Sequence, residues 1–174
     1  MTKKINIVLF GIGNAGSAFI NKISKERKAL ILDSKLDFRF PVITNSTVAF
    51  YEKEGGTFSW EANFIQFGVP FRIEDVYDYI YKNSLDNLIA VDATGSTELV
   101  REYADLVRNG FHIVSVNSTV QKLHPEFEAQ VRLLSNKHGA EYRFPEIRKN
   151  TTAGVADALY NAVLDIAGLK SEAA

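Results

Sequence analysis

Three glycines near the amino terminus have a spacing that could hold a phosphate group. Gly11, Gly13 and Gly16 form a G-x-G-x-x-G pattern directly after the apolar run INIVLF. Here the first glycine permits a tight turn, the second lets the backbone approach a pyrophosphate, and the third lets a helix pack closely on a strand. The amides that follow would face an anion at the positive end of the helix. We predict a dinucleotide-binding loop, with a structural turn as the alternative; its residues are Gly11, Ile12, Gly13, Asn14, Ala15 and Gly16.

A second segment with suitable chemistry is DATGS, which begins at Asp92 where an apolar run ends. Thr94 and Ser96 could hydrogen-bond a ribose or a nicotinamide amide, and Gly95 would let the nicotinamide ring approach the backbone. The structural alternative is that Ser96 or Thr97 caps the helix that follows, and the two roles are compatible. We expect Asp92 to be structural.

A dinucleotide site usually has a carboxylate, or a basic residue for a 2′-phosphate, at the end of its second strand. The corresponding sequence here is TNST, which contains neither. Asn45 and Ser46 can donate hydrogen bonds to a hydroxyl or a phosphate, so they are compatible with NAD and with NADP as the cofactor. The alternative is that both are ordinary polar loop residues.

No other arrangement of side chains indicates catalysis or metal binding. His112, His124 and His138 are not spaced with a second set of ligands, and we predict no metal site. Neither a Ser/His/Asp set nor a pair of carboxylates stands out, so the residues alone predict no catalytic group.

Length and composition favour a single domain that binds a small molecule. The chain has 174 residues, of which 46% are hydrophobic, enough for one substantial core. A net charge of -1 provides no field that would attract nucleic acid or an anionic membrane. No apolar run approaches the roughly 20 residues that span a bilayer. With no cysteine in the chain, we expect a soluble, cytoplasmic protein.

Hydrophobic periodicity predicts alternating strands and helices. Such alternation favours parallel βαβ units, and therefore a doubly wound, mostly parallel α/β sheet of the Rossmann-like type in one domain. Ligands of such sheets bind beyond the carboxyl ends of the strands, where both segments described above would lie. The expected strands are 5–10, 37–46, 87–96 running into a loop, 111–117 and 141–144; the expected helices are 14–29, 73–84, 97–109, 125–137 and 153–167; and 47–72 is expected to be helix or loop cover.

Three segments, taken in order, resemble the cofactor-binding domain of homoserine dehydrogenase. They are VLFGIGNAGSAFINKI, VITNS and VDATGSTELVREYADLVRNGFHIVSVN, and the resemblance extends over residues 4–144. It implies NAD(P)-dependent interconversion of homoserine and aspartate semialdehyde. It assigns the phosphate-binding turn to residues 11–16, places Asn45 and Ser46 near the adenosine and Thr94, Gly95 and Ser96 beside the nicotinamide, and matches Asn117 to an asparagine of the family at the end of a later strand.

The chain also departs from the pattern of this family. Where members typically have a lysine thought to act in catalysis, this chain has Ser118, although Lys122 follows four residues later. Members also continue into a substrate-binding and dimerisation domain. We therefore interpret residues 1–174 as an NAD(P)-binding domain without the substrate domain, inactive alone. The alternatives are a non-catalytic dinucleotide sensor, and a half-enzyme completed by another polypeptide or by a homo-oligomer.

Overall fold

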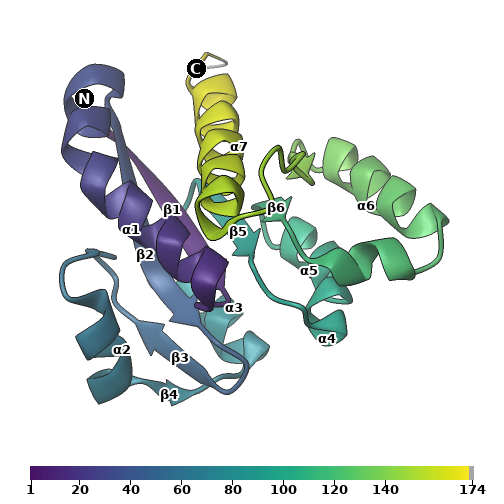
Figure 1. The fold of residues 1–174 in the computed structure, drawn as a ribbon, viewed down its shortest axis with the longest axis horizontal. Coiled ribbons are helices and arrows are strands. Elements are labelled where there is room, and N and C mark those ends of the chain that lie inside the picture. Colours follow the sequence, from purple (N-terminus) through teal and green to yellow (C-terminus); the bar gives the residue numbers. More distant parts are fainter. Residues whose placement is uncertain (173–174) are drawn as a thin grey trace.

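The computed structural model describes residues 1–172, with side chains to residue 168, and contains one seven-stranded sheet (Figure 1). The strand order is β4-β3-β2-β1-β5-β6-β7. Strands β2, β1, β5, β6 and β7 pair in parallel, whereas β3 is antiparallel to both β2 and β4. The strands are β1 (Lys3–Phe10), β2 (Leu36–Thr44), β3 (Val48–Tyr51), β4 (Val69–Pro70), β5 (Leu88–Asp92), β6 (Phe111–Ser115) and β7 (Tyr142–Arg143).

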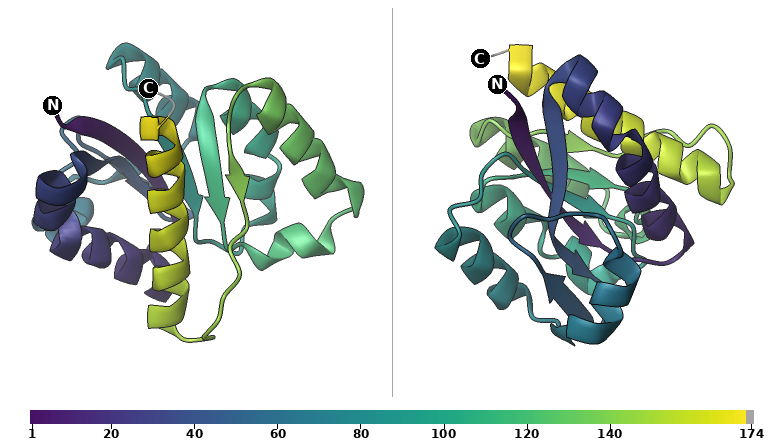
Figure 2. Two further views of the ribbon diagram at one scale, coloured as in Figure 1. Left: turned by 90° about the horizontal axis from the view of Figure 1, so that it is seen from above. Right: turned by 90° about the vertical axis from the view of Figure 1, so that its left-hand side faces the viewer.

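Helices cover both faces of the sheet, as expected for a doubly wound fold (Figure 2). Helices α1 and α7 lie side by side on one face, where α2 also contributes to the core, and α3 to α6 cover the other. The helices are α1 (Asn14–Ala29), α2 (Trp60–Phe67), α3 (Ile73–Lys82), α4 (Thr97–Val100), α5 (Tyr103–Arg108), α6 (Glu126–Lys137) and α7 (Thr152–Glu172), with a π-helix η1 (Leu30–Ser34) and a 3₁₀-helix η2 (Ser118–Lys122).

The buried strands explain the continuous apolar runs in the sequence. Along β1, Ile7 and Leu9 enter the core beneath α1 and α7, whereas Val8 and Phe10 enter the core on the opposite face. Because successive side chains of a strand point to opposite faces, a strand covered on both sides must be apolar at nearly every position. The predicted doubly wound α/β architecture is therefore confirmed.

Segment 47–72 differs from the expectation of helix or loop cover, because it contains β3 and β4 as well as α2. These strands have only four and two residues, too few for a periodic pattern in the sequence. Helix α2 lies between them and buries Trp60 and Phe64, four positions apart on one face. The segment therefore extends the sheet beyond β2 instead of only covering it.

One helix also differs from its expected form, and β2 contains an irregularity. The helix expected over 97–109 is interrupted between α4 and α5, where the amide of Glu102 donates to the carbonyl of Leu99 and tightens the turn. Pro41 lies inside β2, at a register shift where the pairing of Asn6 with Arg39 is followed by that of Val8 with Val42. This irregularity accommodates a residue that cannot donate to the ladder.

A buried carboxylate ties α1 to the start of β2. Asp37 accepts hydrogen bonds from Arg27 Nε at 2.8 Å and from Arg39 Nε at 2.9 Å. Burial raises the pKa of Asp37, but the bonds and charges of the two arginines outweigh burial and hold this pKa below its ordinary value. The ionised form of Asp37 is therefore the stabilising one.

We predict that Asp37→Asn lowers the free energy of unfolding near neutral pH by about 1–3 kcal/mol, because the paired charge is lost. Since the pKa of Asp37 is lower in the folded state, its contribution is present above the ordinary value of 3.8 and disappears as the pH falls through the lowered pKa. Urea unfolding of the parent and the variant over this pH range should show the difference shrink. A difference independent of pH would contradict the assignment.

Candidate dinucleotide site

A cleft of about 700 Å³ opens at the carboxyl ends of β1, β2 and β5. This is the switch point of the sheet, because the connection after β1 leads to β2 on one side and β5 pairs with β1 on the other. Its volume is typical of small-molecule sites. The predicted site residues that line it together are Gly11, Ile12, Gly13, Asn45, Ser46, Thr94, Gly95 and Ser96.

Two glycines of the first loop occupy positions that exclude a side chain, and the third has open space beside it. Gly11 has a φ of +97°, and a Cβ on it would lie 2.7 Å from the carbonyl oxygen of Ala93. A Cβ on Gly16 would collide with the carbonyl oxygen of Gly11, so α1 packs against the loop backbone. A Cβ on Gly13 would meet nothing within 4 Å, and Gly13 lines the cleft. Gly11 and Gly16 thus permit the tight turn and the close packing that the sequence predicts, whereas the approach of a phosphate to Gly13 stays a prediction.

Asn14, Ala15 and Gly16 form the first turn of α1, behind the residues that line the cleft. No side chain caps this 16-residue helix, and its first turn contains no acidic residue. The loop is held by the Ser17 hydroxyl, which donates to the carbonyl of Ile12 at 2.6 Å. The amino end of α1 therefore keeps amides that a bound anion can accept from.

The DATGS loop is held by a buried network around Asp92. One carboxylate oxygen of Asp92 accepts from the amide (2.9 Å) and the hydroxyl (2.7 Å) of Thr94. The other accepts from the Tyr103 hydroxyl at 2.6 Å and from Asn117 Nδ2 at 3.0 Å. The Tyr103 hydroxyl also lies 2.7 Å from Ser115 Oγ. Asp92 is thus structural, as expected.

Asn117 is fully buried and does not line the cleft. Its Nδ2 also donates to the carbonyl of Ser96 at 2.9 Å, and its Oδ1 accepts from the amide of Thr119 at 3.0 Å. It therefore supports the loop from behind, and its contact with a cofactor stays a prediction. Ser96 Oγ accepts from the amide of Leu99 at 3.2 Å, which confirms the predicted capping role.

Burial shifts the pKa values of two groups in this network. Burial raises the pKa of Asp92, and the hydrogen bonds from Tyr103, Thr94 and Asn117 oppose that rise. Burial also raises the pKa of Tyr103, and the neighbouring Asp92 carboxylate raises it further. Tyr103 consequently stays a hydrogen-bond donor, as the arrangement around Asp92 requires.

At the end of β2, Asn45 has a structural role that the sequence left open. Its Oδ1 accepts from the amides of Thr47 at 2.9 Å and Val48 at 2.7 Å, which shapes the turn into β3. The side-chain oxygen is thus used within the protein, and only the amide nitrogen is left to donate to a ligand. Ser46 is exposed in the same turn.

Sequence reasoning missed a large part of the cleft wall. Phe71 belongs to segment 47–72, which is expected only as helix or loop cover, and Ile73 belongs to the apolar face of the next predicted helix. Glu98 and Glu102 come from the broken helix after β5, where charged side chains are usually solvated. The position of the two glutamates in the cleft becomes clear only from the folded structure, where α3 packs beside α4 and beside the turn that follows α4. The additional lining residues are Phe10, Thr44, Phe71, Ile73, Ala93, Glu98, Leu99 and Glu102.

Ser118 and Lys122 are both exposed, at the two ends of η2. Neither lines the cleft. Among residues 1–168, whose side chains the structure describes, no group of three or more histidine, aspartate or glutamate side chains is arranged to hold a metal ion. In the same part of the chain, no helix combines the length and apolar character needed to cross a bilayer.

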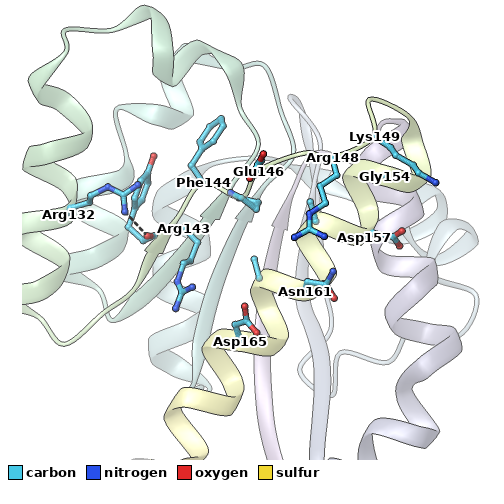
Figure 3. A pocket seen from close by; sticks show the side chains of 14 residues that line it. Arg132, Arg143, Phe144, Glu146, Arg148, Lys149, Gly154, Asp157, Asn161 and Asp165 are labelled. Carbon is cyan, nitrogen blue, oxygen red and sulfur yellow. Dashed lines mark hydrogen bonds between the residues drawn. The ribbon is translucent and has the colours of Figure 1, made fainter.

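A second groove, also of about 700 Å³, lies between β7 and α7 (Figure 3). Basic side chains line it from the β7 side and the following loop, whereas Asp157 and Asp165 line it from α7. None of the predicted site residues lies there. The convergence of the predicted residues places the candidate site in the first cleft.

A doubly wound sheet with a glycine loop at its switch point defines a dinucleotide-binding fold of the Rossmann type. A family model described as the homoserine dehydrogenase NAD-binding domain matches residues 11–145. The chain therefore belongs to the family of homoserine dehydrogenase NAD-binding domains.

Two curated relatives are similar in sequence to this chain. The bifunctional aspartokinase/homoserine dehydrogenase of Buchnera aphidicola is 26% identical over 144 residues, which are 82% of this chain and 17% of the relative. Bifunctional aspartokinase/homoserine dehydrogenase 2 of Escherichia coli is 25% identical over 165 residues, 94% of this chain and 20% of the relative. The chain thus spans about a fifth of the length of these relatives or less.

Solved homoserine dehydrogenases share the fold. The Thermoplasma acidophilum enzyme has a TM-score of 0.64 at 16% identity, over 82% of this chain and 43% of that one. A hyperthermophilic archaeal homoserine dehydrogenase mutant in complex with NADPH has a TM-score of 0.61 at 15% identity, over 82% of this chain and 44% of that one.

We predict that Tyr103→Phe lowers the free energy of unfolding by about 1–3 kcal/mol, because a buried carboxylate loses a donor. Tyr51→Phe is a matched control, since the Tyr51 hydroxyl is buried without a hydrogen-bond partner in the described structure. Its removal should be neutral or stabilising. Urea unfolding measures both effects, and equal losses would show that the network around Asp92 adds no stability.

Proposed function

We propose that the cleft binds the dinucleotide with its pyrophosphate over the glycine loop, at the amino end of α1. In this arrangement the adenosine lies toward Asn45 and Ser46, and the nicotinamide lies toward the loop from Thr94 to Ser96. The observation that carries the proposal is the open side of Gly13, which faces the cleft beside an uncapped helix terminus. Backbone amides and the helix dipole together favour an anion there.

Substitution at Gly13 tests this arrangement. Gly13 has a φ of -66°, which any residue adopts, and space for a Cβ, so Gly13→Val should fold normally. Its side chain would occupy the place of the pyrophosphate. We expect NADH and NADPH to bind about tenfold more weakly or worse, equivalent to about 1.4 kcal/mol.

Gly56→Val is the matched control, because a Cβ on Gly56 also meets nothing within 4 Å and Gly56 lies outside the cleft. Fluorescence titration with each reduced cofactor gives the dissociation constants, and circular dichroism checks the fold. Cofactor binding by Gly13→Val that equals binding by the parent would disprove the assignment of the phosphate loop.

We also propose that this domain is the cofactor half of a homoserine dehydrogenase-like oxidoreductase. Such an enzyme would interconvert homoserine and aspartate semialdehyde when the rest of an active site is supplied. The dinucleotide carries the hydride, and the protein must hold the nicotinamide against the substrate carbonyl. Support comes from the family of the domain. A non-catalytic sensor that reads the dinucleotide remains the second reading, favoured by Ser118, which lacks the cationic proton donor that a lysine would provide.

We predict that the 174-residue chain alone does not turn over aspartate semialdehyde with NADH or NADPH, even when it binds the cofactor. Hydride transfer needs both reactants in near-attack geometry, and effective molarities of about 10⁵ M or more depend on an ordered site. Steady-state assays of the purified chain test this. Turnover near a typical kcat of roughly 10 s⁻¹ would refute both the sensor and the half-enzyme readings.

The remaining readings are separated by adding other proteins to the same assay. Turnover that requires both the chain and a cell extract, and exceeds that of the extract alone, supports completion by another polypeptide. If turnover appears without extract, Lys122→Ala tests whether Lys122 has taken the role of the lysine that the family carries at the position of Ser118.

A further inference from the structure

The charges that line the dinucleotide cleft all have the same sign. Among the described residues, the charged side chains of the lining are Glu98 and Glu102, and the lining contains no lysine, arginine or histidine. The side-chain charge of this cleft is therefore negative, apart from the positive amino end of α1 beside Gly13. The overall charge of the chain, only -1, does not reveal this local bias.

The fold holds one carboxylate in place and leaves the other near the surface. Glu102 is half-buried in the turn between α4 and α5, and its Oε2 accepts from the Tyr77 hydroxyl of α3 at 3.3 Å. Glu98 is exposed in the first turn of α4. Both line the same cleft as the uncharged Asn45 and Ser46. The wall formed by α3 connects the two ends of the cleft, because the amide of Phe71 donates to the carbonyl of Thr47 in the turn after β2, and Tyr77 of α3 holds Glu102.

The two nicotinamide dinucleotides differ in a group that such charges discriminate. NADP carries a phosphate on the adenosine ribose where NAD has a neutral hydroxyl. A phosphate monoester has a charge of about -1.5 to -2 near neutral pH. Without a cation in the lining, this phosphate would be repelled by the carboxylates across a partly enclosed space, where screening by solvent is reduced. NAD shares the pyrophosphate but lacks the 2′-phosphate, so it would not incur this additional repulsion.

We infer that Glu98 and Glu102 make the cleft select NAD(H) over NADP(H). This inference rests on the proposed function, because it requires the adenosine to occupy the cleft. The selection works by repelling NADP(H), since neither carboxylate has to contact NAD(H). In this fold the discriminating charge comes from the segment after β5 instead of the end of β2.

The test compares dissociation constants for NADH and NADPH in the parent, Glu98→Gln, Glu102→Gln and the double variant. We expect the parent to prefer NADH. Each single variant should reduce the ratio of the NADPH dissociation constant to the NADH dissociation constant roughly threefold to tenfold. The double variant should reduce this ratio more. The change should come mainly from NADPH, whose binding should tighten more than that of NADH because it carries the additional phosphate.

Glu126→Gln is the matched control, because Glu126 is an exposed acid in the first turn of α6, outside the cleft, and the net charge changes equally. The ratio of the two dissociation constants should not move in this variant. Added salt gives a second readout, since screening should narrow the preference of the parent but have less effect on the double variant. A purely structural role would change stability and leave the ratio constant.

The outcomes separate this inference from the proposed function. If the parent binds both cofactors and the ratio of their dissociation constants is unchanged in the double variant, the inference is wrong and the proposed function stands. A parent that prefers NADPH also overturns the inference alone. If the parent binds neither cofactor, the proposed function fails, and the selectivity fails with it.

Discussion

The close approach of three backbone segments at the switch point is the constraint on which the cleft depends. Gly11 lies against the carbonyl of Ala93, at the end of β5, and Gly16 lies against the carbonyl of Gly11. A side chain at either glycine would push β1, α1 and β5 apart, and at Gly11 it would also strain a backbone with positive φ. Since the cleft is the space beyond these contacts, its shape and the direction of α1 are fixed together.

The second loop of the cleft is positioned differently, through a buried charge instead of backbone contact. Asp92 is almost inaccessible to solvent, and its oxygens are satisfied by Thr94, Tyr103 and Asn117. A buried carboxylate is costly unless every lone pair finds a donor, so the network permits few alternative conformations of the loop. Rigid presentation of the hydroxyls and amides of the loop follows from this cost.

The sequence allowed the doubly wound fold and much of the cleft to be predicted, because both depend on local signals. The glycine loop directly follows β1, and strands alternating with helices place polar segments at one edge. The rest depends on tertiary packing. Strands β3 and β4 are too short for a periodic signal. Glu102 enters the cleft because the helix breaks beside α3. Tyr103 reaches Asp92 through the packing of α5.

The packing of α7 supports our proposal that binding and chemistry are separable in this domain. Leu159, Val163 and Ile166 of α7 are buried in the same core as α1 and the strands. Helix α7 therefore forms part of the hydrophobic layer behind the glycine loop. Holding a dinucleotide needs only this preorganised edge of the sheet, whereas hydride transfer also needs groups that hold a small aldehyde over the nicotinamide. The fold meets the requirement for holding a dinucleotide, whereas hydride transfer depends on the groups that are placed against the fold.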